Sequence, residues 1–94
     1  MDACKKHWRS RAYMILRVAV YLGFVLPARA YQCVDCKKQA RSYDHRDYAN
    51  ALRVEPVCHR CNIRRGTAIY PSHITRRSLS QDYPWLFAAY YAKH

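Results

Sequence analysis

The most apolar stretch of the chain lies near its N-terminus, at residues 12–26. Within and just before it, apolar side chains recur at spacings of three and four residues: Trp8, Ala12, Ile15, Ala19 and Leu22. This periodicity places them on one face of a helix. We therefore expect an N-terminal helical segment over residues 5–26, with the helix running from about Lys5 to Gly23 and Pro27 preventing its continuation.

A membrane span is the alternative reading of the same stretch, and the sequence disfavours it. A span needs roughly 20 consecutive apolar residues. This run is shorter, contains Arg17 and is followed by Pro27. We expect no membrane association.

Residues 78–94 predict a second helical segment at the C-terminal end. Asp82 is placed to cap the helix and Pro84 to occupy its first turn, where proline is tolerated. The sequence that follows, Trp-Leu-Phe-Ala-Ala-Tyr-Tyr, is nearly all apolar or aromatic. The main expectation is that it packs across the N-terminal helix as core; the alternative is a surface for a homodimer or a protein partner.

Four of the five cysteines form two Cys-x-x-Cys pairs, Cys33 with Cys36 and Cys58 with Cys61. This spacing suits tetrahedral thiolate ligation of Zn²⁺ and is poor geometry for disulfides. A site closed by four cysteines is structural, and a chain of 94 residues needs such a staple because its core is small. Cys4 remains as a spare thiol. Free thiols and a polar, basic N-terminus without a secretory signal predict a reducing, cytoplasmic location.

The zinc-bound core is expected to span residues 31–66 of a single domain covering residues 1–94. It would contain a turn at the first cysteine pair, a short hairpin through residues 42–45, and a short helix that begins near Cys58. Gly66, one of only two glycines, fits the C-terminal cap of that helix. The predicted fold class is a small α+β zinc-bound domain flanked by terminal helices.

Charge points to a class of partner. Seventeen Lys and Arg against six Asp and Glu give a formal net charge of +11. Such a field attracts polyanions, foremost nucleic acid, with anionic lipid or an acidic protein surface as weaker candidates. The residues expected to contact phosphates are Lys37, Lys38, Arg46, Arg60, Arg64 and Arg65. For the cluster of Lys37, Lys38, Arg41 and Arg46, ordinary solvated charge explains each residue equally well when it is taken singly.

The residues between and after the cysteine pairs resemble a known family. Asp44 and His45 lie between the pairs, Asn62 directly follows the fourth cysteine, and Gly66 comes four residues later. This combination resembles the HNH (ββα-metal) nucleases, in particular the phage recombination endonuclease VII branch and small phage HNH-like proteins. In the latter, a His-x-Asp-Tyr stretch like His45-Arg-Asp-Tyr precedes the second pair. The resemblance covers roughly residues 7–66 and implies a treble-clef/ββα-metal core.

The resemblance also implies a function, a DNA endonuclease that hydrolyses phosphodiesters with one catalytic Mg²⁺ or Mn²⁺. Asp44 and Asn62 would bind that ion, and His45 would be the general base. Zinc would be structural, and the location would be the cytoplasm of a bacterial host. One departure is that the family's base-orienting Asn is absent, because Arg53 or Val54 occupies its place and Asn50 is displaced.

Two other functions stay open. One is a non-catalytic zinc module that binds nucleic acid through the same basic face. The other is a small phage protein that binds and inhibits a host protein complex through the terminal helices. In both cases Asp44 could cap a turn, His45 could pack on the hairpin and Asn62 could be an ordinary polar residue. The arrangement of these three side chains is the discriminating observation.

Overall fold

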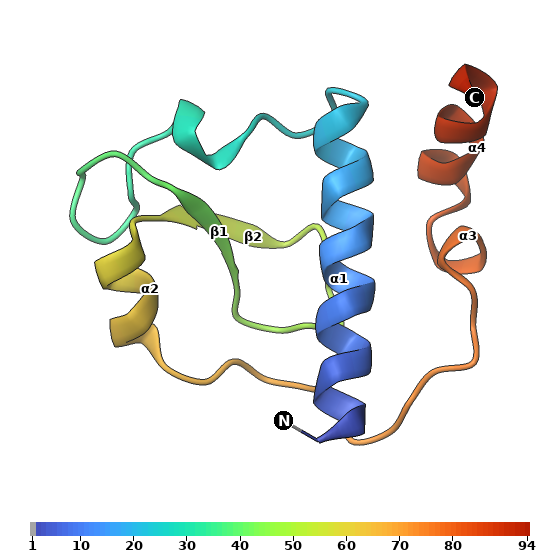
Figure 1. Ribbon diagram of the computed structural model, residues 1–94, viewed down its shortest axis with the longest axis horizontal. Coiled ribbons are helices and arrows are strands. Elements are labelled where there is room, and N and C mark those ends of the chain that lie inside the picture. The colour runs from blue at the N-terminus through green and yellow to red at the C-terminus, as the bar shows by residue number, and fades with distance from the viewer. Residues whose placement is uncertain (1) are drawn as a thin grey trace.

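The structure is a computed structural model that describes residues 2–94. Its elements follow in the order α1 (Ala3–Tyr21), a 3-10 turn η1 (Ala28–Ala30), β1 (Ser42–His45), β2 (Val54–Val57), α2 (His59–Arg65), α3 (Leu79–Asp82) and α4 (Pro84–Lys93). Figure 1 shows α1 as the central element, with the strands and α2 on one side and α3 and α4 on the other. The predicted α+β class is confirmed.

Helix α1 begins where a side chain caps it and ends where a glycine changes the backbone. Asp2 is the N-cap, and its carboxylate accepts a hydrogen bond from the Lys5 amide at 2.8 Å. The helix ends at Tyr21, and Gly23 then adopts a φ of 85°, which favours glycine. Residues 2–94 contain no helix with the length and apolar character needed to cross a membrane.

The main core lies between α1 and α4. Most of the predicted apolar face of α1 is buried, with Leu22 half-buried. Buried residues of α1 join residues of the β1–β2 connection and of α4 in one cluster: Ala12, Ile15, Val18, Ala19, Ala51, Leu86 and Phe87. Ile15 and Leu86 are fully buried. The expectation that the C-terminal aromatic segment packs on the N-terminal helix as core is therefore confirmed.

The predicted cap of the last helix is wrong. Asp82 is the final residue of the short helix α3, and Tyr83 occupies the N-cap position of α4 without a side-chain cap. The Asp82 carboxylate instead pairs with Arg11 of α1 and with Arg77. Two guanidinium partners thus hold the carboxylate away from the α4 amides, whereas Pro84 does start the helix as expected.

A two-stranded antiparallel sheet lies on the side of α1 opposite α3 and α4. Strand β1 pairs with β2 in a register that joins Ser42 to Val57 and His45 to Val54. Val57 is fully buried and packs with Cys33 and Cys61 in a second, smaller cluster. The sheet therefore lies directly against the cysteine region, and β1 ends with Asp44 and His45.

Candidate functional site

The two cysteine pairs converge on one point. The sulfur atoms of Cys33, Cys36, Cys58 and Cys61 all lie within 4.8 Å of one another, and those of Cys36 and Cys58 are 3.7 Å apart. Four sulfurs at about 2.3 Å from a tetrahedral Zn²⁺ would be separated by about 3.8 Å. The donor set and its spacing therefore fit a structural metal ion such as zinc, with every position supplied by the protein.

Local backbone geometry presents the four sulfurs. In the first turn the Lys37 amide donates to the Cys33 carbonyl at 2.9 Å, and Lys37 itself adopts a positive φ of 67°. In the second turn Cys58 is the N-cap of α2, and its sulfur accepts a hydrogen bond from the Cys61 amide at 3.4 Å. Cys4 is not part of this cluster, because its thiol donates to the Pro71 carbonyl at 3.3 Å.

The thiols influence one another electrostatically. Burial opposes ionisation of Cys33, but hydrogen bonds from the backbone of Cys58, Cys36 and Asp35 lower its pKa to about 6. The sulfur of Cys58 and burial raise the pKa of Cys61 to about 12. A first thiolate thus discourages the next, and a divalent cation removes that penalty because it stabilises all four charges together.

Asp44, His45 and Asn62 line one cavity of about 580 Å³. Asp44 and His45 come from the end of β1, and Asn62 comes from α2, directly after the buried Cys61. The far wall of the cavity is α1. The cysteine cluster and this cavity therefore share α2, which has Cys58 as its N-cap and contains Cys61.

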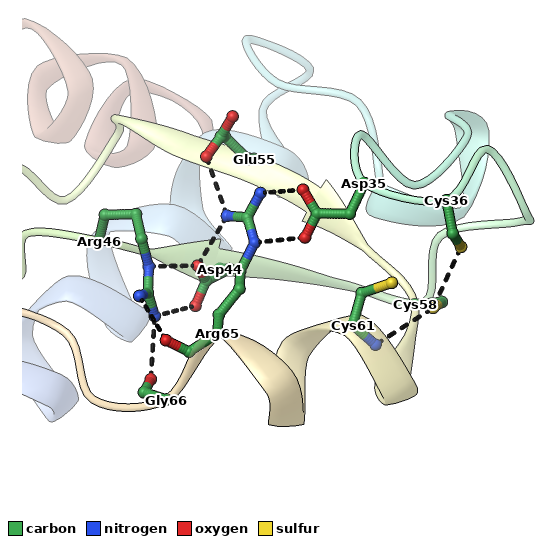
Figure 2. A network of polar contacts seen from close by, with 9 residues as sticks. All are labelled: Asp35, Cys36, Asp44, Arg46, Glu55, Cys58, Cys61, Arg65 and Gly66. Carbon is green, nitrogen blue, oxygen red and sulfur yellow. Dashed lines mark hydrogen bonds and ion pairs between the residues drawn. The ribbon is translucent and has the colours of Figure 1, made fainter.

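The Asp44 carboxylate is buried, with only 7% of its side chain exposed, and two arginines hold it (Figure 2). Arg46 donates from Nε to Oδ2 at 2.7 Å and from Nη2 to Oδ1 at 3.2 Å. Arg65 donates from Nη1 to Oδ2 at 2.9 Å. A carboxylate offers about four acceptor positions, so three contacts leave one, and it lies on Oδ1.

Arg65 links the first cysteine turn, β1 and β2 through ion pairs, as Figure 2 shows. Besides Asp44 it makes two hydrogen bonds of 2.8 Å to Asp35, which lies between the first two cysteines, and one of 2.9 Å to Glu55 of β2. Only 14% of its side chain is exposed. The hydrogen bond from Arg65 lowers the pKa of Asp35, and these carboxylates, Asp35 first, raise the pKa of Arg65.

His45 is buried and held in one orientation. Its Nε2 lies 2.8 Å from the carbonyl oxygen of Ala51. Because a carbonyl only accepts, Nε2 carries the proton and Nδ1 keeps its lone pair. The ring stacks on Tyr48 with centroids 4.9 Å apart, and Tyr48 stacks on Tyr70 at 4.6 Å. Burial lowers the pKa of His45, so the neutral imidazole predominates at pH 7.

The Ala51 carbonyl holds the His45 ring at the position where the sequence lacks a base-orienting Asn. No side chain at Arg53, Val54 or Asn50 orients the imidazole; a backbone carbonyl of the β1–β2 connection does so. Asn50 instead donates from its side chain to Asp47 at 3.0 Å. Backbone groups carry no residue signature, so the sequence pattern could not reveal this contact.

Asn62 differs from Asp44 in its surroundings. Its backbone N–H donates to the backbone carbonyl of Cys58, the N-cap of the helix, at 3.0 Å. Its side chain is half-buried at the cavity and has no hydrogen-bond partner among residues 2–94. The side-chain oxygen is thus available to a ligand.

The basic residues fall into two groups. Lys37, Lys38, Arg60 and Arg64 are exposed, whereas Arg46 and Arg65 are engaged in the ion pairs described above. Sequence reasoning missed three further cations at the cavities beside Asn62, namely Lys5, Arg9 and Arg17 of α1. Their spacing of four and eight residues was the signal that could have identified them as one helical stripe.

Comparison of the chain with models of known families, with curated proteins and with solved structures found no match.

Proposed function

We propose that this protein is a metal-dependent phosphodiesterase of the HNH type, with a treble-clef/ββα-metal core, that cuts DNA. The observation that carries the proposal is the arrangement at the cavity. A buried carboxylate, a free amide side chain and a neutral imidazole with an available Nδ1 line the same cavity, in a protein of formal net charge +11. These are the groups required to bind a divalent cation and to activate water.

Asp44 and Asn62 fit a Mg²⁺ or Mn²⁺ ion. The remaining acceptor position of Asp44 and the unpaired side-chain oxygen of Asn62 would supply two oxygen ligands, and both residues line the same two cavities. Mg²⁺ prefers such a set, with one or two protein oxygens and several retained waters. When bound, the ion would polarise the scissile phosphate and stabilise the leaving oxygen.

His45 would be the general base. With Nε2–H held by Ala51, Nδ1 is the nitrogen that takes the proton from the attacking water. The stack on Tyr48 limits rotation of the ring, and the lowered pKa keeps it unprotonated at neutral pH. Arg46 and Arg65 hold the Asp44 carboxylate in place as they compensate its charge.

A second candidate function is a non-catalytic zinc module that binds nucleic acid. The specific observation in its favour is that three hydrogen bonds from Arg46 and Arg65 already satisfy most of the Asp44 carboxylate. In this case Asp44 would be a structural anchor for the two arginines. The basic surface would remain and would bind phosphates without cleaving them.

The test is cleavage of supercoiled and branched DNA by the zinc-loaded protein with added Mg²⁺ or Mn²⁺. The variant is His45→Ala, and the matched control is His73→Ala, because His73 has an exposed side chain in the loop before α3. We expect cleavage by wild type and by the control, and loss of at least about a hundredfold in rate with His45→Ala.

Binding of DNA without cleavage under all of these conditions would replace the nuclease with the non-catalytic module. Equal cleavage by His45→Ala and wild type would remove His45 from the mechanism. Zinc content measured on each protein separates loss of the base from loss of the fold.

A further inference from the structure

Two cavities adjoin at the candidate site and form one groove. The first, of about 580 Å³, contains His45 and extends toward Arg17; the second, of about 510 Å³, extends toward Lys5 and Tyr70. Four residues line both of them: Arg9, Asp44, Tyr48 and Asn62. The candidate metal ligands therefore lie in the middle of the groove, and the groove continues past them in both directions.

One stripe of α1 lines the groove along its length. Lys5, Arg9, Tyr13 and Arg17 are spaced by four residues, and each lines at least one of the two cavities. Residues at this spacing lie on one face of a helix. From Lys5 to Arg17 the stripe extends about 18 Å, at a rise of about 1.5 Å per residue.

The groove is positively charged on both sides of its centre. Toward one end Arg17 lines a cavity with Arg41, and toward the other Lys5 and Arg9 line a cavity with one further carboxylate, Asp2, the N-cap of α1. The carboxylate at the centre, Asp44, is compensated by two guanidinium groups. A polyanion lying in the groove would thus meet cations before and after the site of cleavage.

Aromatic rings accompany these cations. Tyr13 is 61% exposed, and the Arg17 guanidinium lies 5.7 Å from its ring centroid. The ammonium group of Lys5 lies 5.6 Å from the centroid of Tyr70, the outer ring of the stack that ends at His45. Alternating cationic and aromatic side chains along a groove are typical of sites that follow a nucleic-acid strand.

We propose that one phosphodiester strand lies along α1 in this groove, with Lys5 and Arg17 holding phosphates on opposite sides of the scissile one. The proposal rests on the proposed function for the position of the scissile phosphate, but the binding it describes does not require cleavage. The strand could be a single-stranded nucleic acid or one strand of a duplex or branched DNA. A folded acidic protein would contact the rim of the groove and leave its interior unused.

The test measures binding of fluorescently labelled DNA by anisotropy, over a series of salt concentrations and without Mg²⁺ or Mn²⁺. Three DNAs are compared: a single strand, its duplex and a four-way junction. The variants are Lys5→Ala and Arg17→Ala. The control is Lys6→Ala, because Lys6 is exposed, adjacent in sequence and lines neither cavity. Zinc content and circular dichroism verify that each protein is folded.

For a single strand, each phosphate contact contributes about −0.7 to the slope of log K against log salt, so contacts from Lys5, Arg9, Arg17 and Arg41 predict a slope of about −3. Each groove variant should reduce the magnitude of the slope by about 0.7 and weaken binding roughly fivefold at low salt. Lys6→Ala should change neither quantity. The DNA form that shows these effects most strongly identifies the source of the strand.

Two results would refute the proposal that a phosphodiester strand lies in the groove. One is the absence of DNA binding by wild type; the other is an equal effect of Lys6→Ala and the groove variants. Cleavage measured on the same proteins keeps the two proposals apart. If Lys5→Ala and Arg17→Ala leave metal-dependent cleavage unchanged, the nuclease proposal stands and the groove proposal fails. If both variants weaken DNA binding but no protein cleaves DNA, the groove proposal stands and the nuclease proposal fails.

Discussion

Arg65→Ala should destabilise the fold, although the residue belongs to a surface helix of a strongly basic protein. Its guanidinium contacts three carboxylates, those of Asp35, Asp44 and Glu55. Of these three, only Asp44 is buried. Removing a charge-assisted hydrogen bond from a buried carboxylate costs about 1.5–3 kcal/mol. The contact to exposed Glu55 adds little, because solvent screens it. Since Arg46 still holds Asp44, we expect the free energy of unfolding to fall by about 2 kcal/mol, near the middle of this range.

The assay is urea unfolding of the zinc-loaded protein, with Arg64→Ala as the control. Arg64 is the preceding residue of α2 and is exposed, so its removal should change the free energy of unfolding by less than about 0.5 kcal/mol. Arg65→Lys should recover only part of the loss, since an ammonium group cannot reproduce the bidentate contact with Asp35. Equal stability of Arg65→Ala and Arg64→Ala would refute the structural role assigned to Arg65.

Two further predictions concern the metal and the base. Purified protein should contain one zinc per chain, and Cys33→Ser should unfold it, because metal-binding free energy contributes to folding; well-folded protein without metal would contradict this. Cleavage should be constant above pH 6.5 and fall as the pH drops through the lowered pKa of His45. The free energy of unfolding should also decrease below pH 6.5, where the unfolded chain takes up a proton that the buried ring resists; a pH-rate profile and urea titrations measure both effects.

Sequence periodicity was sufficient for α1 because its apolar positions face a single core. The same side chains that recur at three- and four-residue spacing, such as Ile15 and Ala19, are those buried against Leu86. The candidate metal ligands among the cysteines were equally predictable, since the spacing of the two cysteines within each pair is a local property of the sequence. Both features depend on contacts between neighbours in sequence or on one dominant face.

Features that depend on long-range polar contacts were not predictable. Asp82 has the sequence signature of a helix cap, but Arg11, far away in sequence, pairs with it. Arg65 reads as a surface phosphate ligand, and the structure surrounds it with carboxylates from three segments. A charge pattern gives the number of cations, whereas their partners are set by the fold.

The proposed catalytic ion can be located by the anomalous diffraction of crystals of the zinc-loaded protein soaked in Mn²⁺. We expect a manganese peak in the groove, bound by the oxygens of Asp44 and Asn62 and facing Nδ1 of His45, in addition to zinc among the four cysteines. Zinc at the cysteines with no manganese at Asp44, and with both arginines still on its carboxylate, would contradict the catalytic role and leave a zinc module that binds nucleic acid.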